Sequence, residues 1–475
     1  MMRPLLAARR LEFGVALLLL LAAAPVAGQE SGETGLSSER WRTDLGHLQH
    51  TFPDRHLDAF HDMSRASFER GLQRLRERVG AWPDHIVGVQ LARVVNQVGD
   101  GHSGIRLFSD TALSFRSYPL ELRVFPDGIH VIAAGPEHPG LVGRRVIRIG
   151  NRSAAAALAE VAELVARDNG MDALTFGPTL LVMPEVLQGV GIVEETASAP
   201  FTFEGEDGAR TVRLEPGDGA FRLEGHSLLD LRYREEGWVR LLGRRGDDTP
   251  LLHRDPTVPF WSEWLPDDGA LYAQINAMAD RSEESFAEFS RRVVSTAAER
   301  GADRIVLDLR WCRGGNGYLI RPLVLELLKS PFDAPGRLFV LTGRRTFSAG
   351  QMLVSELARL SHARFVGEPT ANRPNLYGDN EKIVLPESGI TVRAAYVRWQ
   401  LRDPRDDRPC SGPHVHAPWT VRDWRRGHDP ALAAALAWSS DERAAGAAGE
   451  DPSDAGGVYS VFLCRNGGPR TGSMF

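Results

Sequence analysis

The sequence has little cysteine and no long apolar run after its first thirty residues. Only three cysteines occur among 475 residues, and no paired CxxC motif is present, which excludes a structural zinc site of that type. Three cysteines in an oxidising compartment can form at most one disulfide. We expect Cys410 to pair with Cys464, and Cys312, which follows an apolar strand pattern, to be a buried small side chain.

The sequence also lacks an excess of basic charge. Its formal net charge is -6 at pH 7, so there is no positive field to hold a polyanion, and we expect no nucleic-acid partner. With 43% hydrophobic and 25% charged residues, the composition is that of a globular protein. The length is enough for roughly three domains.

The amino terminus has the pattern of a secretory signal peptide. Three arginines precede an apolar run over 15–24, and small residues follow at 25–28. The apolar run is about ten residues long, whereas a spanning helix needs about twenty. We therefore expect residues 1–28 to be a signal peptide, the mature chain to be exported to the periplasm or the outside, and no membrane span to remain after cleavage.

Residues 29–112 are predicted to form an N-terminal helical domain. Apolar residues recur at helical spacing from Glu39 to about Val98. Ser67 is a candidate N-cap of the second helix. The helical pattern ends at the "GDGHS" stretch of 99–103, where two glycines allow a tight backbone path.

Residues 113–216 are predicted to form a β-rich module. Short alternating runs surround one helical pattern at 154–168. The segment "GLVGRRVIRIGNRSAAAAL" at 140–158 is similar to part of a PDZ-like domain, and such domains bind an extended peptide at a sheet edge. A module that only braces the fold is the alternative, and the residues do not decide between them.

The most regular stretch follows a bridging segment at 217–262. Strand and helix patterns alternate over 263–440, which predicts a parallel sheet covered by helices. Ligands in such sheets bind at the carboxyl ends of the strands. The last helix of this α/β core is expected to have Asp429 as its N-cap, with Pro430 in its first position. Residues 441–475 have a linker-like composition and are predicted to be a flexible tail.

Two turns lie at carboxyl ends of strands in this core. Gly314 and Gly315 follow a strand in "LDLRWCRGGNG", and Ser348 follows another in "TFSAG". A serine between a strand and a helix has an exposed hydroxyl in the positive field of the helix terminus, which suits a nucleophile. By itself, however, such a serine is more often an N-cap, and His102 alone is more often a loop histidine.

Five ordered motifs together resemble the tail-specific or C-terminal processing peptidases and the tricorn core. The resemblance extends from about Trp41 to Trp438. It implies a ClpP/crotonase-like parallel sheet with helices, a serine endopeptidase activity on peptides or unfolded proteins, and no cofactor; an oligomer is compatible with it. The motifs are "VGDGHSGI", "IVLDLRWCRGGNG", "TFSAGQMLVSEL", "FVGEPTANRPNLYGDNEKIVLPESGITV" and "HAPWTVRDWRRGHDPALAAAL".

The resemblance implies roles for individual residues. Ser348 would be the nucleophile, and the Ala349 N–H would form an oxyanion hole with the N–H of Gly314 or Gly315. At the position of the lysine used by processing peptidases stands Arg373, which cannot lose its proton near neutral pH. A Ser-Lys dyad is therefore excluded.

The tricorn-like branch instead uses a histidine from the helical domain, and the matching loop contains His102. Histidine suits the base role, and we expect the reaction rate to rise through a pKa near the unperturbed value of about 6.5. The third member of the triad is left open among Asp406, Asp407 and Glu368. Asp100 could instead only fix the loop. Cys312 stands where the family usually has asparagine.

Two other interpretations of the sequence remain. His414 and His416 are two positions apart, so on an extended segment they face the same side and could bind zinc with a carboxylate; we expect no metal, since no HExxH helix accompanies them. The chain could also be a non-catalytic peptide- or ligand-binding relative that keeps the fold.

Overall fold

The computed structural model describes residues 35–205, 208–217, 237–242 and 249–438. The predicted signal peptide, the predicted tail and Cys464 lie outside the described residues. The predicted boundaries at 29–112, 113–216, 217–262 and 263–440 stay predictions. The mixed α/β architecture is confirmed.

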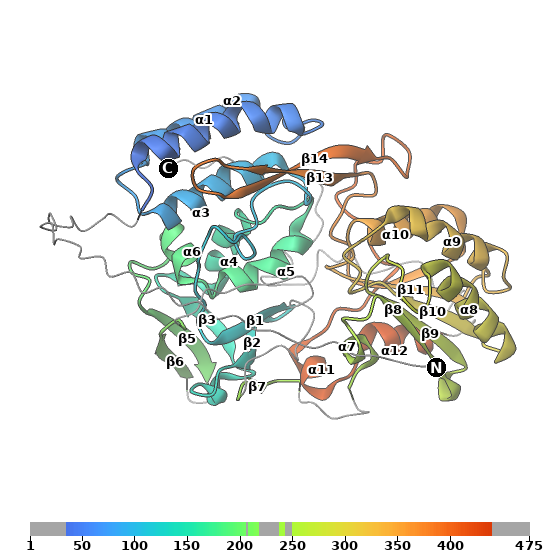
Figure 1. The fold of residues 1–475 in the computed structure, drawn as a ribbon. Helices are drawn as coiled ribbons and strands as arrows, with labels where there is room; N and C mark the ends of the chain where they lie inside the picture. Colours follow the sequence, from blue (N-terminus) through green and yellow to red (C-terminus); the bar gives the residue numbers. More distant parts are fainter. Residues whose placement is uncertain (1–34, 206–207, 218–236, 243–248, 439–475) are drawn as a thin grey trace, which may run out of the picture. The chain divides into compact units, whose positions relative to one another are not determined.

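Three helices begin the described chain (Figure 1). Ser37 and Ser64 cap the first two, since each side chain accepts a backbone N–H of the first turn. The prediction that Ser67 is the second cap is wrong: the helix begins three residues earlier, and the Ser67 N–H donates to Ser64 Oγ at 3.1 Å. The third helix leads to Gly99, which has a φ of 92° and turns the chain away. The helices are α1 (Ser38–Arg55), α2 (Arg65–Arg78) and α3 (Asp84–Val95).

An antiparallel sheet follows, in the order β1-β2-β3-β5-β6, with β4 paired to β3 and β7 paired to β2. The helix predicted over 154–168 ends at Ala162, because the chain turns there and leaves Asp168 and Asn169 in a loop before the next helix. The PDZ-like character of this region stays a prediction. Its elements are β1 (Leu120–Phe125), β2 (Gly128–Ala134), β3 (Arg145–Ile149), β4 (Arg152–Ser153), α4 (Ala154–Ala162), α5 (Gly170–Leu180), α6 (Pro184–Gly189), β5 (Ala199–Gly205), β6 (Gly208–Leu214) and β7 (Val239–Arg240).

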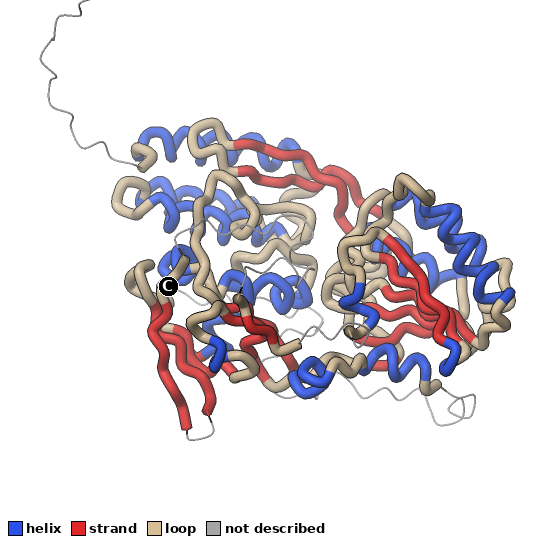
Figure 2. Tube along the Cα trace, turned by 60° about the horizontal axis from the view of Figure 1, so that its bottom comes forward, coloured by secondary structure: helices blue, strands red, loops and turns tan. Residues whose placement is uncertain are grey.

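The predicted parallel sheet is confirmed, in the order β15-β12-β11-β10-β9-β8, and only β8 runs antiparallel to its neighbour. Figure 2 shows these strands with helices on both faces. The predicted cap Asp429 and the first-turn Pro430 of the last helix are also confirmed. The elements are α7 (Leu251–Arg254), β8 (Phe260–Leu265), β9 (Ala270–Ile275), α8 (Phe286–Glu299), β10 (Arg304–Asp308), α9 (Ile320–Leu328), β11 (Leu338–Thr342), α10 (Ala349–Leu360), β12 (Arg364–Gly367), β15 (Val415–His416), α11 (Val421–Arg426) and α12 (Pro430–Leu436).

Alternate side chains of the sheet enter two separate hydrophobic clusters. Leu271, Ala273 and Ile275 of β9 pack with α8, α9 and α10 on one face. Tyr272, between them in the sequence, packs with α12 on the other face. Because both faces are covered, the strands are apolar throughout, which explains why they were recognisable as continuous apolar runs.

A two-stranded ribbon, β13 (Leu376–Val384) and β14 (Thr391–Trp399), connects the core to the helices. In Figure 1 it extends from the side of α10 to α1 and α3. Its residue Arg393 exchanges two backbone hydrogen bonds with Gly104, at 2.9 and 3.0 Å. Sequence analysis did not predict this ribbon, which brings the loop after α3 to the parallel sheet.

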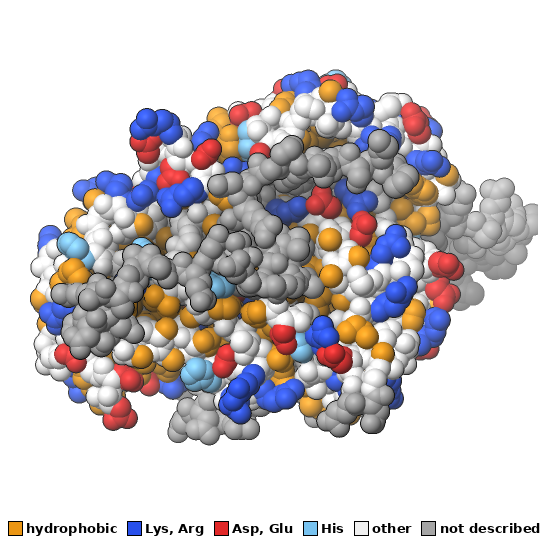
Figure 3. Space-filling view, turned by 180° about the vertical axis from the view of Figure 1, so that it is seen from behind, with side chains coloured by type: hydrophobic (Ala, Val, Ile, Leu, Met, Phe, Trp, Pro, Cys, Tyr) orange, Lys and Arg blue, Asp and Glu red, His pale blue; other side chains and the backbone are white. Residues whose placement is uncertain are grey.

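The described surface carries charges of both signs. On the face in Figure 3, basic and acidic side chains are interspersed, with apolar side chains between them. Among the described helices, none combines the length and the apolar character that crossing a bilayer requires.

Candidate active site

Ser348 lies in a strained turn between β11 and α10. Its φ of 53° and ψ of -124° are unusual for a residue with a side chain, and such conformations cost about 1–3 kcal/mol and occur mostly at functional sites. The Ser348 side chain makes no capping hydrogen bond to α10. The hydroxyl therefore does not cap α10, although an N-cap is the more common role for a serine at this position.

The glycine turn after β10 packs directly against Ser348. Gly314 and Gly315 have φ values of 117° and 125°, and a Cβ on Gly314 would lie 2.6 Å from Ser348 Cβ. Two further hydrogen bonds fix the turn: the Phe347 N–H donates to Cys312 O at 2.9 Å, and the Met278 N–H donates to Gly314 O at 2.8 Å. Glycine is therefore needed at 314 for both conformation and space.

Two backbone N–H groups beside Ser348 have no acceptor among the described residues: those of Ala349 and Gly315. The Gly314 N–H interacts with the sulfur of Cys312, whose thiol pKa is raised to about 12 by burial. The Ser348 N–H donates to Asn372 Oδ1 at 2.6 Å. Ala349 and Gly315 thus supply the donors that an oxyanion could use.

His102 reaches Ser348 from the loop after α3. Its Nε2 lies 3.0 Å from Ser348 Oγ, although 246 residues separate the two. The ring stacks on Phe347, with centroids 4.5 Å apart and planes at 23°. A Cβ on Gly101 would lie 2.6 Å from the Phe347 ring, so this loop and the nucleophile turn are in close contact.

Asp100 holds the backbone of the His102 loop. Its Oδ1 accepts the N–H groups of His102 and Ser103 at 2.9 and 2.7 Å. Its Oδ2 is 2.9 Å from His56 Nε2, and His56 Nδ1 accepts the Asp58 N–H, so the proton of His56 points at Asp100. Burial raises the pKa of Asp100, but the His56 hydrogen bond and charge outweigh it and leave the pKa below its usual value.

The pKa of His102 is lowered to about 4, first by burial and then by the charges of Arg106 and Arg313, against the raising effect of Asp100. The prediction that His102 has a pKa near 6.5 is therefore wrong. It assumed an unperturbed histidine, because the burial of this side chain has no signal in the sequence. His102 is neutral near pH 7, so its Nε2 can accept the Ser348 hydroxyl proton.

Among the described residues, no carboxylate completes a triad at His102. Its Nδ1 is buried and makes no hydrogen bond of normal geometry to a described residue, and a looser hydrogen bond to the Tyr377 backbone raises the pKa of the ring. None of the three candidates is bonded to it. Glu368 pairs with Arg344 at 2.7 Å, Asp406 pairs with Arg408 at 2.7 Å, and Asp407 makes no hydrogen bond to His102.

Arg373, at the lysine position of the processing peptidases, turns its side chain to Asp62, with 3.2 Å between Nη2 and Oδ2. Its neighbour Asn372 was missed by sequence analysis, although its side chain holds the Ser348 amide. Asp168 was missed as well, because it was assigned to the end of a helix. The position of Asn372 directly before Arg373 was the only signal for it, and Asp168 gave none.

His414 and His416 do not form a metal site with other described residues. His414 Nδ1 accepts the Phe365 N–H at 3.0 Å, and no group of three or more histidine, cysteine or carboxylate ligands occurs in the described part of the chain.

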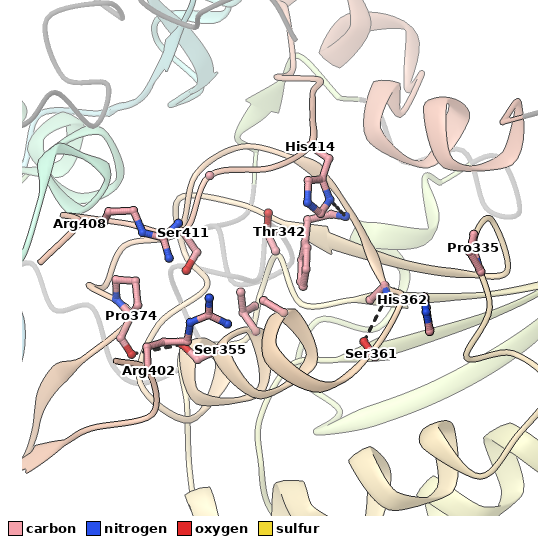
Figure 4. A pocket seen from close by; sticks show the side chains of 15 residues that line it. Pro335, Thr342, Ser355, Ser361, His362, Pro374, Arg402, Arg408, Ser411 and His414 are labelled. Atoms are coloured by element: carbon pink, nitrogen blue, oxygen red, sulfur yellow. Dashed lines mark hydrogen bonds between the residues drawn. The ribbon is translucent and has the colours of Figure 1, made fainter. Parts of the chain in front are cut away.

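A pocket of about 430 Å³ is lined by residues from α10 and the loops after β14 (Figure 4). Neither Ser348 nor His102 lines it. Ser355 faces Pro374 there, at 3.2 Å from Oγ to the carbonyl oxygen. The two arginines at this pocket, Arg402 and Arg408, both pair with Asp406, so their charge is partly neutralised. Since neither reacting side chain lines the pocket, it is separate from the candidate active site.

No family model matches the sequence, and no curated protein matches it. The structure of mature CPAF complexed with lactacystin is similar to this chain, with a TM-score of 0.57, 12% identity, and coverage of 84% of this chain and 99% of that chain.

Two further solved structures are more distant. They are the photosystem II D1 C-terminal processing protease, with a TM-score of 0.35, 12% identity and coverage of 80% and 93%, and the tricorn protease, with 0.39, 14% and coverage of 84% and 36%. The resemblance to the tail-specific peptidase group is confirmed for the fold.

Proposed function

We propose that the chain is a serine peptidase with Ser348 as nucleophile and His102 as general base. The observation that carries the proposal is the 3.0 Å contact between His102 Nε2 and Ser348 Oγ, made at the start of a helix by a serine in a strained conformation. The fold likeness to the tail-specific peptidases supports it. A serine and a histidine that only stabilise the fold can form their hydrogen bonds with nearby backbone groups. Here the two side chains, 246 residues apart in the sequence, contact each other instead.

In the proposed reaction, the Ser348 hydroxyl donates its proton to His102 as its oxygen attacks a peptide carbonyl. The carbonyl oxygen becomes negative and is held by the N–H groups of Ala349 and Gly315, each worth roughly 3–4 kcal/mol in comparable sites. His102 then gives the proton to the leaving amine, and water releases the acyl group by the reverse steps.

In the part of the chain that the structure describes, no carboxylate accepts a hydrogen bond from Nδ1 of the imidazolium formed in this step. Asp100 is the negative charge that stabilises it, because this carboxylate raises the pKa of His102 through space. Glu368, Asp406 and Asp407 are not needed in this scheme. The arrangement corresponds to a dyad supported electrostatically, and we expect it to be slower than a complete triad.

The proposed substrates are peptides or unfolded proteins, as for the family that the sequence resembles. Export is part of the proposal, based on the arginines and the apolar run of residues 1–28. No metal or cofactor enters any step of this acyl transfer.

A binding protein without turnover is the second candidate. Two observations favour it: the lowered pKa of His102 makes it a weak base, and no described carboxylate is hydrogen-bonded to its Nδ1. Such a protein would keep the site geometry and hold a peptide without cleaving it.

Covalent labelling separates the two candidates. A fluorophosphonate probe should label the mature protein at Ser348, and Ser348→Ala should abolish labelling, whereas Ser295→Ala, on the exposed side of α8, should not change it. His102→Ala should slow labelling about 10²–10⁴-fold, and the exposed control His47→Ala should leave the rate unchanged. Absence of labelling in folded protein that still binds peptide would favour the binding protein.

A further inference from the structure

Asp168 lies in the loop between α4 and α5, far from the motifs that identified the site, yet its carboxylate is buried against them. Its Oδ1 accepts the Gly101 N–H at 2.7 Å. Its Oδ2 accepts Asn372 Nδ2 at 2.8 Å and the Arg373 N–H at 2.9 Å. All three partners are nitrogen donors from two segments that are otherwise distant in the sequence.

The partners of Asp168 are directly connected to the two reacting side chains. Gly101 precedes His102 in the chain. Asn372 uses its Oδ1 to accept the Ser348 N–H at 2.6 Å, so the amide of Asn372 bridges Asp168 and the nucleophile. One carboxylate therefore connects the base loop, through Gly101, with the nucleophile turn, through Asn372.

We infer that Asp168 is a positioning residue, which sets His102 against Ser348 by holding Gly101 and Asn372 at the same carboxylate. This inference rests on the proposed function. It assigns no contact with substrate to Asp168, which acts only through the two segments that it joins.

The hydrogen-bond pattern requires Asp168 to be ionised. A carboxylate accepts all three N–H groups, whereas a protonated carboxyl oxygen would direct its own hydrogen at one of these donors. Burial raises the pKa of Asp168, the Arg373 N–H lowers it, and the charge of Asp100 raises it again, to about 7 overall. The hydrogen bonds should therefore be complete above pH 7 and become weaker below it.

The neighbouring charges are engaged elsewhere. Asp100 pairs with His56, the Arg373 guanidinium with Asp62, Arg167 with Glu163, and Arg313 with Asp172. Burial lowers the pKa of His102 to about 4, well below the pKa of Asp168, which burial raises to about 7.

The first test is the pH profile of labelling at Ser348. In the wild-type protein, the rate should rise as the pH passes through about 7. The asparagine of Asp168→Asn has one acceptor oxygen, turns an amide donor toward N–H groups and does not titrate, so the labelling rate of this variant should be flat from pH 6 to 8. At pH 8 the rate should be about 10–100-fold below that of the wild type, as expected for a small misplacement of reacting groups.

The matched control is Asn169→Ala in the same loop. The Asn169 side chain donates to Thr370 O and Pro409 O and does not touch the base loop. We expect this variant to be less stable but to keep the inflection near pH 7. An Asp168→Asn protein with the wild-type pH profile would overturn the inference.

The second test does not depend on catalysis. Hydrogen exchange of a peptide covering 97–104, corrected for the intrinsic pH dependence of exchange, should show protection of the Gly101 amide that increases through pH 7 in the wild-type protein and is absent in Asp168→Asn. If the protein is not labelled but shows this protection, the proposed function fails, whereas the connection that Asp168 makes between Gly101 and Asn372 is supported. If the wild-type protection does not change through pH 7, this connection fails, and this outcome needs no variant to fold.

Discussion

Ser348 and His102 are placed by different means. The serine is placed mainly by backbone groups: the chain bends between a buried strand and a helix, and the Phe347 N–H is bonded to the glycine turn. One side chain, that of Asn372, accepts the Ser348 N–H. Buried side chains place the histidine, since Asp100 and Asp168 accept three consecutive N–H groups of its loop. The nucleophile turn is thus held mostly through its backbone, whereas the base loop is held by two buried carboxylates, and the two sides should respond differently to mutation.

The largest expected effect is on the stability of the nucleophile side. Arg310, after β10, is buried between Asp308 and Asp429, with Nη2 2.5 Å and 2.6 Å from their oxygens. Arg310→Met would leave two buried carboxylates without a cation, so we expect the free energy of unfolding to fall by about 3–5 kcal/mol. Urea denaturation of the variant measures this loss.

The control for Arg310 is Arg321→Met on the exposed face of α9, for which a change within about 0.5 kcal/mol is expected. If Arg310→Met lost no more stability than this control, the buried ion pairs of Arg310 would not stabilise the nucleophile side of the core.

A smaller loss of stability, but a clear loss of reactivity, is expected on the base side. Asp100→Asn keeps an acceptor for the N–H groups of His102 and Ser103 but turns an amide donor toward His56. We expect the free energy of unfolding to fall by about 1–3 kcal/mol and the labelling rate of Ser348 to fall by at least about tenfold. Equal losses of stability for Asp100→Asn and Arg310→Met would contradict the contrast between the two sides.

The two carboxylates that hold the base loop, Asp100 and Asp168, should give opposite pH dependences of the free energy of unfolding. The pKa of Asp100 is lowered in the folded protein, so its contribution is present above the unfolded pKa of about 3.9 and is lost as the pH falls. The pKa of Asp168 is raised to about 7, so the folded protein holds a proton that the unfolded chain has lost, and stability falls as the pH rises from about 4 to 7.

Denaturation of Asp168→Asn tests this sign. Between pH 5 and 7 the wild-type protein should lose more stability with rising pH than the variant does. A variant with the same slope as the wild type would show that Asp168 does not titrate in this range. The charge that positions His102 would then be held without a cost in stability.

The part of the site that the sequence predicted is the part with a local pattern. Ser348 and Gly314 lie at the ends of apolar strands and at a glycine pair, so short motifs indicate them. Asp168 and Asn372 act through contacts between segments 204 residues apart, and the ribbon that brings these segments together has no strong pattern of its own. The third carboxylate was sought near the core because the resemblance pointed there, whereas burial decides what surrounds His102.

The smallest expected effect concerns the electrostatics around His102. Below pH 5 the labelling rate should fall as His102 becomes protonated, with a midpoint near 4, well below the step that we attribute to Asp168. Arg106 is one of the cations that lower this pKa, and its own pKa is lowered to about 10 by burial and by the charges of Arg393 and Arg313. Arg106→Met should therefore move the midpoint upward, whereas Arg398→Met, on the ribbon, should not. In Asp168→Asn, which lacks the step near pH 7, a midpoint near 6.5 instead of about 4 would mean that His102 is not buried as described. The difference between the two sides of the site would then be smaller than the structure indicates.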